Sequence, residues 1–301
     1  MQIFDAQATA DRLPFDRLIP AVAQAMLDLS AGRICASPRT VLPLPDGGNY
    51  LVMPCTDDRY AVTKLVAVTP ANRRHGRATI QGRVIVSDAH AGTPLMVLDG
   101  PVVTARRTAA MTLLGVETLL RRNPSRAVLV GTGAQALAHA LAMTERWPGL
   151  QLSCVGRNRL QSEAFVATLT QLGLSTNTLP LEQALDGADM VVTATTSLTA
   201  VLPAHVNPAT LIVGLGSYTP QMAELPAAQI QCRQIWVDDL EGARHEAGDL
   251  LQAGIDWARV RILAEALKTP SLSQSPMLYK TVGHAAWDMA AVRTALSSQE
   301  I

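Results

Sequence analysis

The sequence predicts an α/β fold, in which a doubly wound parallel sheet follows a β-rich N-terminal domain. Three observations support this. Strand and helix patterns alternate from residue 126 onward, which is typical of parallel strands joined by helices. Residues 50–98 instead contain short β-rich runs between turn residues, without helical patterns. The chain has 301 residues, 48% of them hydrophobic, which is enough for the cores of about two domains.

The N-terminal part is expected to combine an amphipathic helix with an antiparallel sheet. Apolar residues recur at helical spacing over residues 15–31, and Gly32 can end that helix. A long helix is predicted over residues 103–122, ending at Asn123-Pro124. The strands are predicted at residues 50–54, 60–68, 79–87 and 94–98.

The C-terminal part is expected to build the parallel sheet. Helices are predicted at residues 134–146, 160–172 and 181–185, and a last helix at about 279–296 would pack apolar side chains against a core. The strands are predicted at residues 127–130, 150–155, 190–194, 211–213 and 234–237.

A glycine-rich turn follows the first of these strands and precedes a helix. Gly131 permits a tight turn, and Gly133 allows a pyrophosphate to approach the backbone. The phosphates would then lie at the positive end of the helix, at Ala134 and Gln135. Ala136 occupies the third glycine position, which tolerates alanine. The pattern in this context predicts a Rossmann dinucleotide-binding domain; a glycine turn without a ligand is the alternative.

The end of the second strand bears on the choice of cofactor. NAD-binding domains usually carry an acidic residue there, whereas this chain has Arg157 and Arg159. Arginine donates charge-assisted hydrogen bonds to a phosphate. We therefore predict NADP(H), with NAD(H) as the alternative. The other explanation of the two arginines is a solvated turn.

Several segments form a recognisable pattern only when they are taken together. They are Pro38-Arg39, Leu51–Pro54, Val62–Val66, Thr79–Gly82, Leu98–Gly100, Thr104–Ala110, Gly131–Gln135, Asp238-Asp239, Glu246–Asp249 and Lys280–Gly283. In this order, which covers nearly the whole chain, they resemble the ornithine cyclodeaminase/mu-crystallin family.

The resemblance implies a homodimer of two-domain subunits. Residues 1–116 would bind the substrate and form the dimer, with a C-terminal helix over 284–301 packing back on them. Residues 117–283 would form the Rossmann domain. The dimer would also pair the edge of a sheet whose strands are too few to close on themselves.

The resemblance further implies that small α-amino or α-imino acids are bound through their carboxylate by Arg39, Lys64 and Arg107. Three cations from separate segments repel one another unless an anion joins them, and a carboxylate offers two oxygens to their donors. A surface ion pair is the ordinary alternative for each residue. Lys64 is also the predicted catalytic residue, as a proton donor to the imine; water is the alternative donor.

Tyr218 stands where the family's cyclodeaminases have an aspartate that handles the substrate's amine. A phenol is neutral at pH 7 and cannot replace that carboxylate, although Glu224 or Asp239 could take its role. The family's ketimine reductases also lack the aspartate.

We therefore predict an NADP-dependent ketimine reductase of proline metabolism. It would reduce Δ1-pyrroline-2-carboxylate to proline, Δ1-piperideine-2-carboxylate to pipecolate, or both, by hydride transfer to the C=N carbon. Tyr218 is included in the predicted substrate site.

Three other functions stay open: an ornithine cyclodeaminase, an alanine-type amino-acid dehydrogenase, and a non-catalytic NADPH-binding protein like mu-crystallin. Ammonia release from ornithine, activity with pyruvate and ammonia, or cofactor binding without turnover would distinguish them. The remaining cofactor contacts are predicted at Thr108, Asn158, Thr193, Thr195, Leu215 and Val282.

Composition excludes several other classes of protein. Lys plus Arg and Asp plus Glu each number 25, so the balance is not that of a nucleic-acid-binding protein. The six histidines and four cysteines are dispersed, and we expect neither a metal site nor a disulfide framework. No apolar run approaches the roughly 20 residues of a membrane span, and the chain begins without a secretory signal. We therefore expect a cytoplasmic protein.

Overall fold

The computed structural model describes residues 1–268 and 276–297, and the chain divides into two compact units. The first, called here the N-terminal unit, comprises residues 1–110 and 284–301; the second, the dinucleotide unit, comprises residues 111–283. The domain boundary was predicted after residue 116, whereas the boundary between the compact units follows residue 110. Both positions lie within helix α3 (Gly100–Leu120). The last four residues of the predicted C-terminal helical segment, 298–301, lie outside the described residues.

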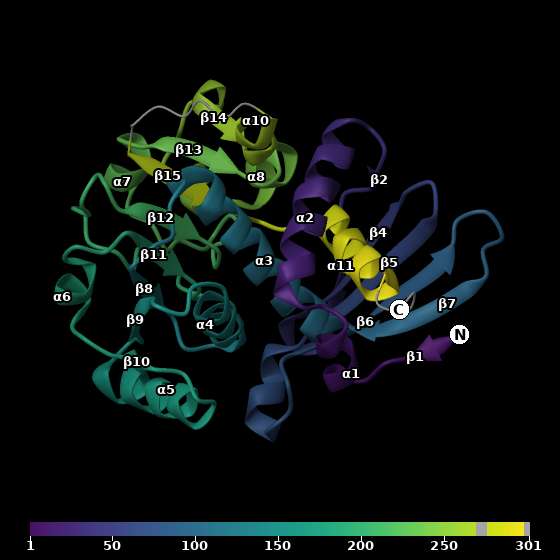
Figure 1. The fold of residues 1–301 in the computed structure, drawn as a ribbon, viewed down its shortest axis with the longest axis horizontal. Helices are drawn as coiled ribbons and strands as arrows, with labels where there is room; N and C mark the ends of the chain where they lie inside the picture. The colour runs from purple at the N-terminus through teal and green to yellow at the C-terminus, as the bar shows by residue number, and fades with distance from the viewer. Residues whose placement is uncertain (269–275, 298–301) are drawn as a thin grey trace. The chain divides into compact units, whose positions relative to one another are not determined.

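A seven-stranded, mostly antiparallel sheet forms the body of the N-terminal unit (Figure 1). Its order is β1-β7-β6-β5-β4-β2, with β3 paired to β4, and only β1 runs parallel to its neighbour. The antiparallel sheet predicted from the sequence is thereby confirmed. Its strands are β1 (Gln2–Ile3), β2 (Cys35–Ala36), β3 (Thr40–Leu44), β4 (Gly48–Thr56), β5 (Tyr60–Val68), β6 (Ile80–Asp88) and β7 (Pro94–Asp99).

Helices cover one face of this sheet. Helix α2 (Phe15–Ser30) matches the predicted amphipathic helix, and α11 (Ala285–Ser297) packs against α2, β4 and β5. The alternation of β5 buries Val62, Lys64 and Val66 on one face. Lys64 therefore points into the core of this unit, between two valines. A short helix, α1 (Ala6–Asp11), precedes α2.

The dinucleotide unit contains an all-parallel eight-stranded sheet of order β10-β9-β8-β11-β12-β15-β13-β14. This confirms the doubly wound sheet. Its strands are β8 (Arg126–Val130), β9 (Gln151–Val155), β10 (Thr176–Asn177), β11 (Met190–Thr193), β12 (Leu211–Gly214), β13 (Gln234–Val237), β14 (Val260–Ile262) and β15 (Met277–Lys280). Its helices after α3 are α4 (Ala134–Arg146), α5 (Arg159–Gln171), α6 (Leu181–Leu185), α7 (Ala227–Gln231), α8 (Leu240–Glu246), α9 (Gly248–Gln252) and α10 (Leu263–Lys268).

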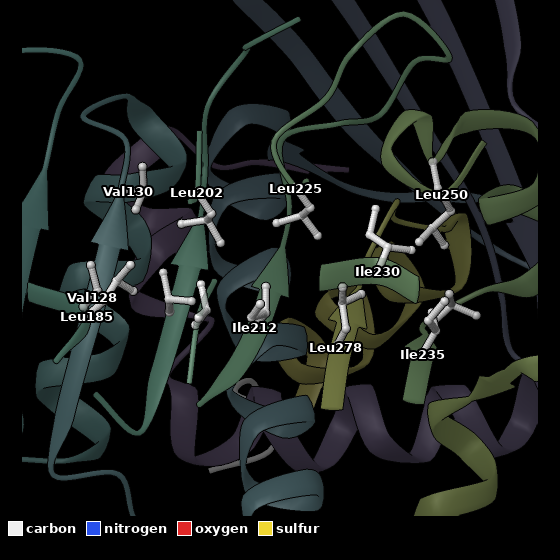
Figure 2. Close-up of a cluster of buried hydrophobic side chains, with 14 of the residues drawn as sticks. Val128, Val130, Leu185, Leu202, Ile212, Leu225, Ile230, Ile235, Leu250 and Leu278 are labelled. Atoms are coloured by element: carbon white, nitrogen blue, oxygen red, sulfur yellow. The ribbon is translucent and has the colours of Figure 1, made fainter. Parts of the chain in front are cut away.

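The core on one side of this sheet is aliphatic. Side chains from neighbouring strands, among them Val128, Ile212, Leu278 and Ile235, lie side by side in Figure 2 and are buried. Strands buried on both faces consist of near-continuous apolar runs rather than alternating ones. This is the pattern that the sequence shows for the central strands.

The prediction of a single helix over residues 279–296 is wrong in its first part. Met277–Lys280 is strand β15, which lies between β12 and β13 in the sheet. Helix α11 begins only at Ala285, after Gly283 with a φ of 82°. A short apolar run that is buried on both faces has no alternation, so periodicity alone cannot distinguish it from a buried helix.

The long helix α3 begins three residues earlier than predicted, at Gly100 rather than at 103. The Asp99 carboxylate accepts a hydrogen bond from the Val102 N–H at 3.1 Å, which satisfies one free donor of the first turn. Among the described residues, no helix is both long enough and apolar enough to cross a membrane.

Candidate active site

The turn between β8 and α4 requires glycine at its first position. Gly131 has a φ of 128°, a conformation that side chains disfavour, and its N–H donates to Val155 O at 2.8 Å. A Cβ at this position would collide with the carbonyl oxygen of Ala194. The backbone of this turn therefore approaches closely the residue that follows β11, as the tight turn of a dinucleotide-binding loop demands.

The next glycine leaves the start of α4 open. Gly133 precedes Ala134, the first residue of α4, and no side chain caps the helix. A Cβ on Gly133 would meet no protein atom within 4 Å, while Ala136 is fully buried. The start of α4 is thus exposed at Gly133 and Ala134, and the helix dipole favours a phosphate at this end. This geometry fits the pyrophosphate of a dinucleotide.

The two arginines after β9 are not equivalent. Arg159 is exposed and pairs with Glu163 at 2.7 Å, one turn along α5. Asn158 caps the same helix, because its Oδ1 accepts from Gln161 N at 2.9 Å. Arg157 is exposed and has no ion pair with a described residue. Of the predicted phosphate contacts here, Arg157 is therefore the one whose guanidinium is not committed to another element.

A buried glutamate joins the loops that follow β11 and β12. Glu224 is fully buried and accepts hydrogen bonds from the Thr193 hydroxyl at 2.9 Å, the Thr195 N–H at 2.6 Å and the Gly216 N–H at 2.6 Å. Burial raises the pKa of its carboxyl, against the lowering effect of Lys280 and these donors. Leu215 N also donates to Thr193 O at 3.0 Å. Three predicted cofactor residues, Thr193, Thr195 and Leu215, are thus brought together, although the Thr193 hydroxyl is engaged by the protein itself.

Two further buried acids stabilise the neighbouring segments. Asp249 Oδ1 accepts from the N–H groups of Glu224 at 2.6 Å and Leu225 at 2.9 Å. Its other oxygen lies 3.9 Å from the fully buried Nζ of Lys280, whose pKa burial lowers.

Asp238 performs the same task beyond β15. Its carboxylate accepts from the Thr281 hydroxyl at 2.6 Å and from the N–H groups of Val282 and Gly283 at 3.0 Å each. Val282, a predicted cofactor residue, is therefore held through its backbone.

The N-terminal unit contains a buried cluster of opposite charges. Lys64 Nζ lies 3.0 Å and 2.8 Å from the two carboxylate oxygens of Asp288, and Arg107 Nε lies 3.4 Å from one of them. All three side chains are at least nine-tenths buried. Burial lowers the pKa of Lys64 to about 8, against the raising effect of Asp288; the charges of Arg107 and Arg39 lower it further. The structure thus brings two of the three predicted cations together, with the half-buried Arg39 close enough to act on Lys64.

With this geometry established, comparison with known proteins identifies the family. The sequence profile described as "Ornithine cyclodeaminase/mu-crystallin family" matches residues 2–296. The chain belongs to the ornithine cyclodeaminase/mu-crystallin family. The resemblance inferred from the ordered motifs is confirmed.

Two similar members of the family are named as reductases of cyclic imino acids. The chain is 42% identical to a Δ1-pyrroline-2-carboxylate reductase of Burkholderia multivorans, over 97% of this chain and 94% of the relative. It is 41% identical to a Δ1-pyrroline-2-carboxylate/Δ1-piperideine-2-carboxylate reductase of Azospirillum brasilense, with the same coverage.

A solved structure shows the same fold. The Δ1-pyrroline-2-carboxylate reductase of Thermococcus litoralis, in complex with NADH and L-proline, superposes with a TM-score of 0.90 at 23% identity, over 100% of this chain and 98% of that chain.

The structure also describes Tyr218 and the two acids that were considered as replacements for the cyclodeaminase aspartate. Tyr218 is 40% exposed in the dinucleotide unit, and burial raises the pKa of its phenol. The two acids considered as replacements are committed elsewhere. Glu224 accepts three hydrogen bonds in the core, and Asp239 caps α8 by accepting from Gly242 N at 2.8 Å. Neither carboxylate is placed as a spare base for an amine.

Asp288 is a functional candidate that the sequence reading passed over. It lies in α11 among buried alanines, Trp287 and Met289, a segment that was predicted from its apolar residues alone. A carboxylate within the apolar run 285–292 of this helix was the available signal, because a buried charge requires a partner.

Thr108 differs from the other predicted cofactor residues. It lies on α3 in the N-terminal unit, whereas the others belong to the dinucleotide unit, and its hydroxyl donates to Thr104 O at 2.7 Å. Among the described residues, no group of His, Cys, Asp and Glu side chains forms a metal site.

Proposed function

We propose that this chain is a ketimine reductase, which reduces Δ1-pyrroline-2-carboxylate and Δ1-piperideine-2-carboxylate with a nicotinamide cofactor. Relatives at 41–42% identity over 97% of the chain carry these substrates in their names. The observation that carries the proposal is the buried cluster of Lys64, Arg107 and Asp288. It supplies what an imino acid requires, which is cations for the carboxylate and a proton for the nitrogen.

The charge of the cluster suits an anionic substrate. With Lys64 protonated, two cations and one carboxylate leave a net charge of +1, to which Arg39 adds. A carboxylate that enters this site restores balance and accepts from Lys and Arg donors in a low-dielectric setting, where such bonds are strong. Arg107 Nε is buried without a hydrogen-bond partner among the described residues. The site is therefore prepared for an anion.

Lys64 also suits the proton transfer. The bound cofactor supplies the hydride, and the imine nitrogen must gain a proton for the carbon to accept it. A lysine with a pKa of about 8 is still mostly protonated at pH 7 but releases its proton more readily than an ordinary lysine. Fixing the carboxylate beside it also limits the orientations of the C=N bond, which is most of what the protein contributes.

We propose NADP(H) as the preferred cofactor. Gly131, Gly133 and the open start of α4 fit a pyrophosphate. Arg157, two residues after β9, is available for a 2′-phosphate, and no acidic residue stands there to accept from a ribose hydroxyl.

We also propose a homodimer formed through the sheet of the N-terminal unit. Alternation places Leu65, Ile85 and Val97 on the face opposite to Lys64, where they are only half-buried. Val41 and Leu42 on β3 are about half exposed. An apolar sheet face of this kind is usually covered in a stable assembly. Light scattering at micromolar concentration should give the mass of two chains.

The cytoplasmic location stays a prediction.

The test is an assay of purified protein with NADPH and each of the two imino acids. We expect NADPH oxidation with formation of proline or pipecolate. Turnover with pyruvate and ammonia, or ammonia release from ornithine, in place of imine reduction would assign one of the other family activities. Cofactor binding without any turnover would indicate a non-catalytic role.

A further inference from the structure

Resting on the proposed function, we propose that Asp288 is a positioning residue for imine reduction. Its carboxylate fixes the Lys64 ammonium beside the Arg107 guanidinium and supplies the counter-charge that both need while no substrate is bound. The residue acts through these two cations rather than by touching the reacting atoms.

The geometry of the carboxylate supports this role. Both Asp288 oxygens lie within 3.0 Å of Lys64 Nζ, which therefore bridges them, and Oδ1 also lies 3.4 Å from Arg107 Nε. The three residues come from α11, β5 and α3. A carboxylate shared by cations from separate elements sets their relative position, as a substrate carboxylate would do on binding.

Burial gives the carboxylate its importance. Asp288 is fully buried, and its neighbours on α11 are the apolar Ala285, Trp287, Met289 and Ala291. Two cations in such surroundings are strongly disfavoured without a compensating charge. The anion predicted to join the cations was the substrate alone; the structure shows that the protein already carries one.

Helix α11 is also held by contacts that do not involve this carboxylate. Arg293, further along the helix, pairs with Asp28 on α2 at 2.6 Å and with Asp57 at 2.9 Å. The Cys55 thiol also donates to Ala285 O at 3.2 Å. Asp28 is therefore a matched control, because it is a buried carboxylate that pairs with a cation of α11 but lies outside the cluster.

The proposal has a consequence for pH dependence. The charged or titratable groups that act on Lys64 are Asp288 from α11, Arg107 from α3 and Arg39 before β3, and the thiol of Cys55 on β4 is nearby. Of these, Asp288 is the one that favours the ammonium; the two arginines disfavour it. Burial raises the pKa of Cys55 well above its ordinary value, so it stays neutral. Removing the Asp288 charge should lower the pKa of Lys64 further, and the proton would be lost at lower pH.

The experiment compares the pH profiles of kcat/KM for the wild type, Asp288→Asn, Asp288→Glu and Asp28→Asn. For Asp288→Asn we expect the basic limb to move down by about one pH unit or more. At a pH above the limb, kcat/KM should then be about tenfold lower than in the wild type. Asp288→Glu should restore part of the shift. Asp28→Asn should lower the unfolding temperature and leave the limb in place. A folded Asp288→Asn variant with the wild-type limb would overturn the proposal.

A second measurement separates this proposal from the function on which it rests. The side-chain amine of Lys64 can be titrated by NMR in the wild type and in Asp288→Asn, without any substrate. If the wild type reduces no imino acid, the proposed function fails, whatever the titration shows. If the wild type is active but the Lys64 titration is the same in both proteins, only the role of Asp288 is refuted.

Discussion

Buried carboxylates have different partners in the two compact units. In the dinucleotide unit, Glu224, Asp249 and Asp238 accept mainly from backbone N–H groups and hydroxyls of the loops beyond the sheet. In the N-terminal unit, the Asp288 carboxylate pairs with the charged ends of Lys64 and Arg107. Acids satisfied by the backbone hold loops in place, whereas Asp288 neutralises the two buried cations that we propose bind the substrate. Asp28 of the same unit also pairs with arginines, Arg33 and Arg293, but it lies outside this cluster.

The largest expected effect is on activity, from removing the cations. Lys64→Ala and Arg107→Ala should each lower kcat/KM for imine reduction by about 10- to 150-fold, because each removes charge-assisted hydrogen bonds worth about 1.5–3 kcal/mol. Cofactor affinity, measured by fluorescence titration, should change little. Arg33→Ala, which removes an exposed cation of the same unit, is the control. Wild-type kcat/KM in either cluster variant would show that the residue does not bind the substrate.

The next effect is on stability, and it concerns the other unit. Glu224→Ala leaves the Thr193 hydroxyl and the N–H groups of Thr195 and Gly216 without their acceptor. At about 1–3 kcal/mol for each unsatisfied group, we expect a loss of about 3 kcal/mol or more in the free energy of unfolding. Glu163→Ala, at an exposed pair with Arg159, should change the free energy of unfolding little, because solvent screens such pairs. Denaturant titration measures the stability of both variants. Equal stability of the two would show that the buried Glu224 does not hold the loops in place.

A smaller effect, on cofactor preference, should distinguish Arg157 from Arg159. Arg157→Asp should weaken NADPH binding at least about tenfold while NADH binding changes little, because a carboxylate repels the 2′-phosphate and suits the ribose hydroxyl. Arg159→Asp should have less effect, since that guanidinium already pairs with Glu163. Comparing the KM values of both cofactors in both variants measures this. Preference of the unmodified protein for NADH would contradict the cofactor assignment.

The smallest effect is expected at Tyr218. Tyr218→Asp places a carboxylate where the family's cyclodeaminases have one, and we expect a trace of ammonia release from ornithine that the wild type lacks. Tyr218→Phe, which keeps the ring without the hydroxyl, should retain imine reduction. Ornithine conversion by the wild type at a rate comparable with imine reduction would show that another group handles the amine.

The sequence was most informative where local chemistry determines structure. The helix at 134–146 and the strand at 234–237 were predicted to the residue, because a glycine turn and an apolar run with polar flanks mark their ends. Strand β15 was misassigned because its apolar run has no period, and β2 was missed because it contains only two residues.

The site shows the same limit. Lys64 and Arg107 were predicted from ordered motifs, but their distance from Asp288 depends on how α11, β5 and α3 pack. Arg107 and Asp288 are more than 180 residues apart in the sequence, and local patterns cannot predict a contact between residues so far apart. The carboxylate of Asp288 within the apolar run 285–292 was the visible sign that such a partner exists.

The most direct test of the account is the steady-state rate of NADPH oxidation with Δ1-pyrroline-2-carboxylate, measured side by side for the wild type and Lys64→Ala. The account predicts rapid reduction by the wild type, with proline as the product, and a fall in kcat/KM of at least about tenfold in the variant. A wild type that binds NADPH but leaves the imino acid unreduced, or a variant as active as the wild type, would contradict it.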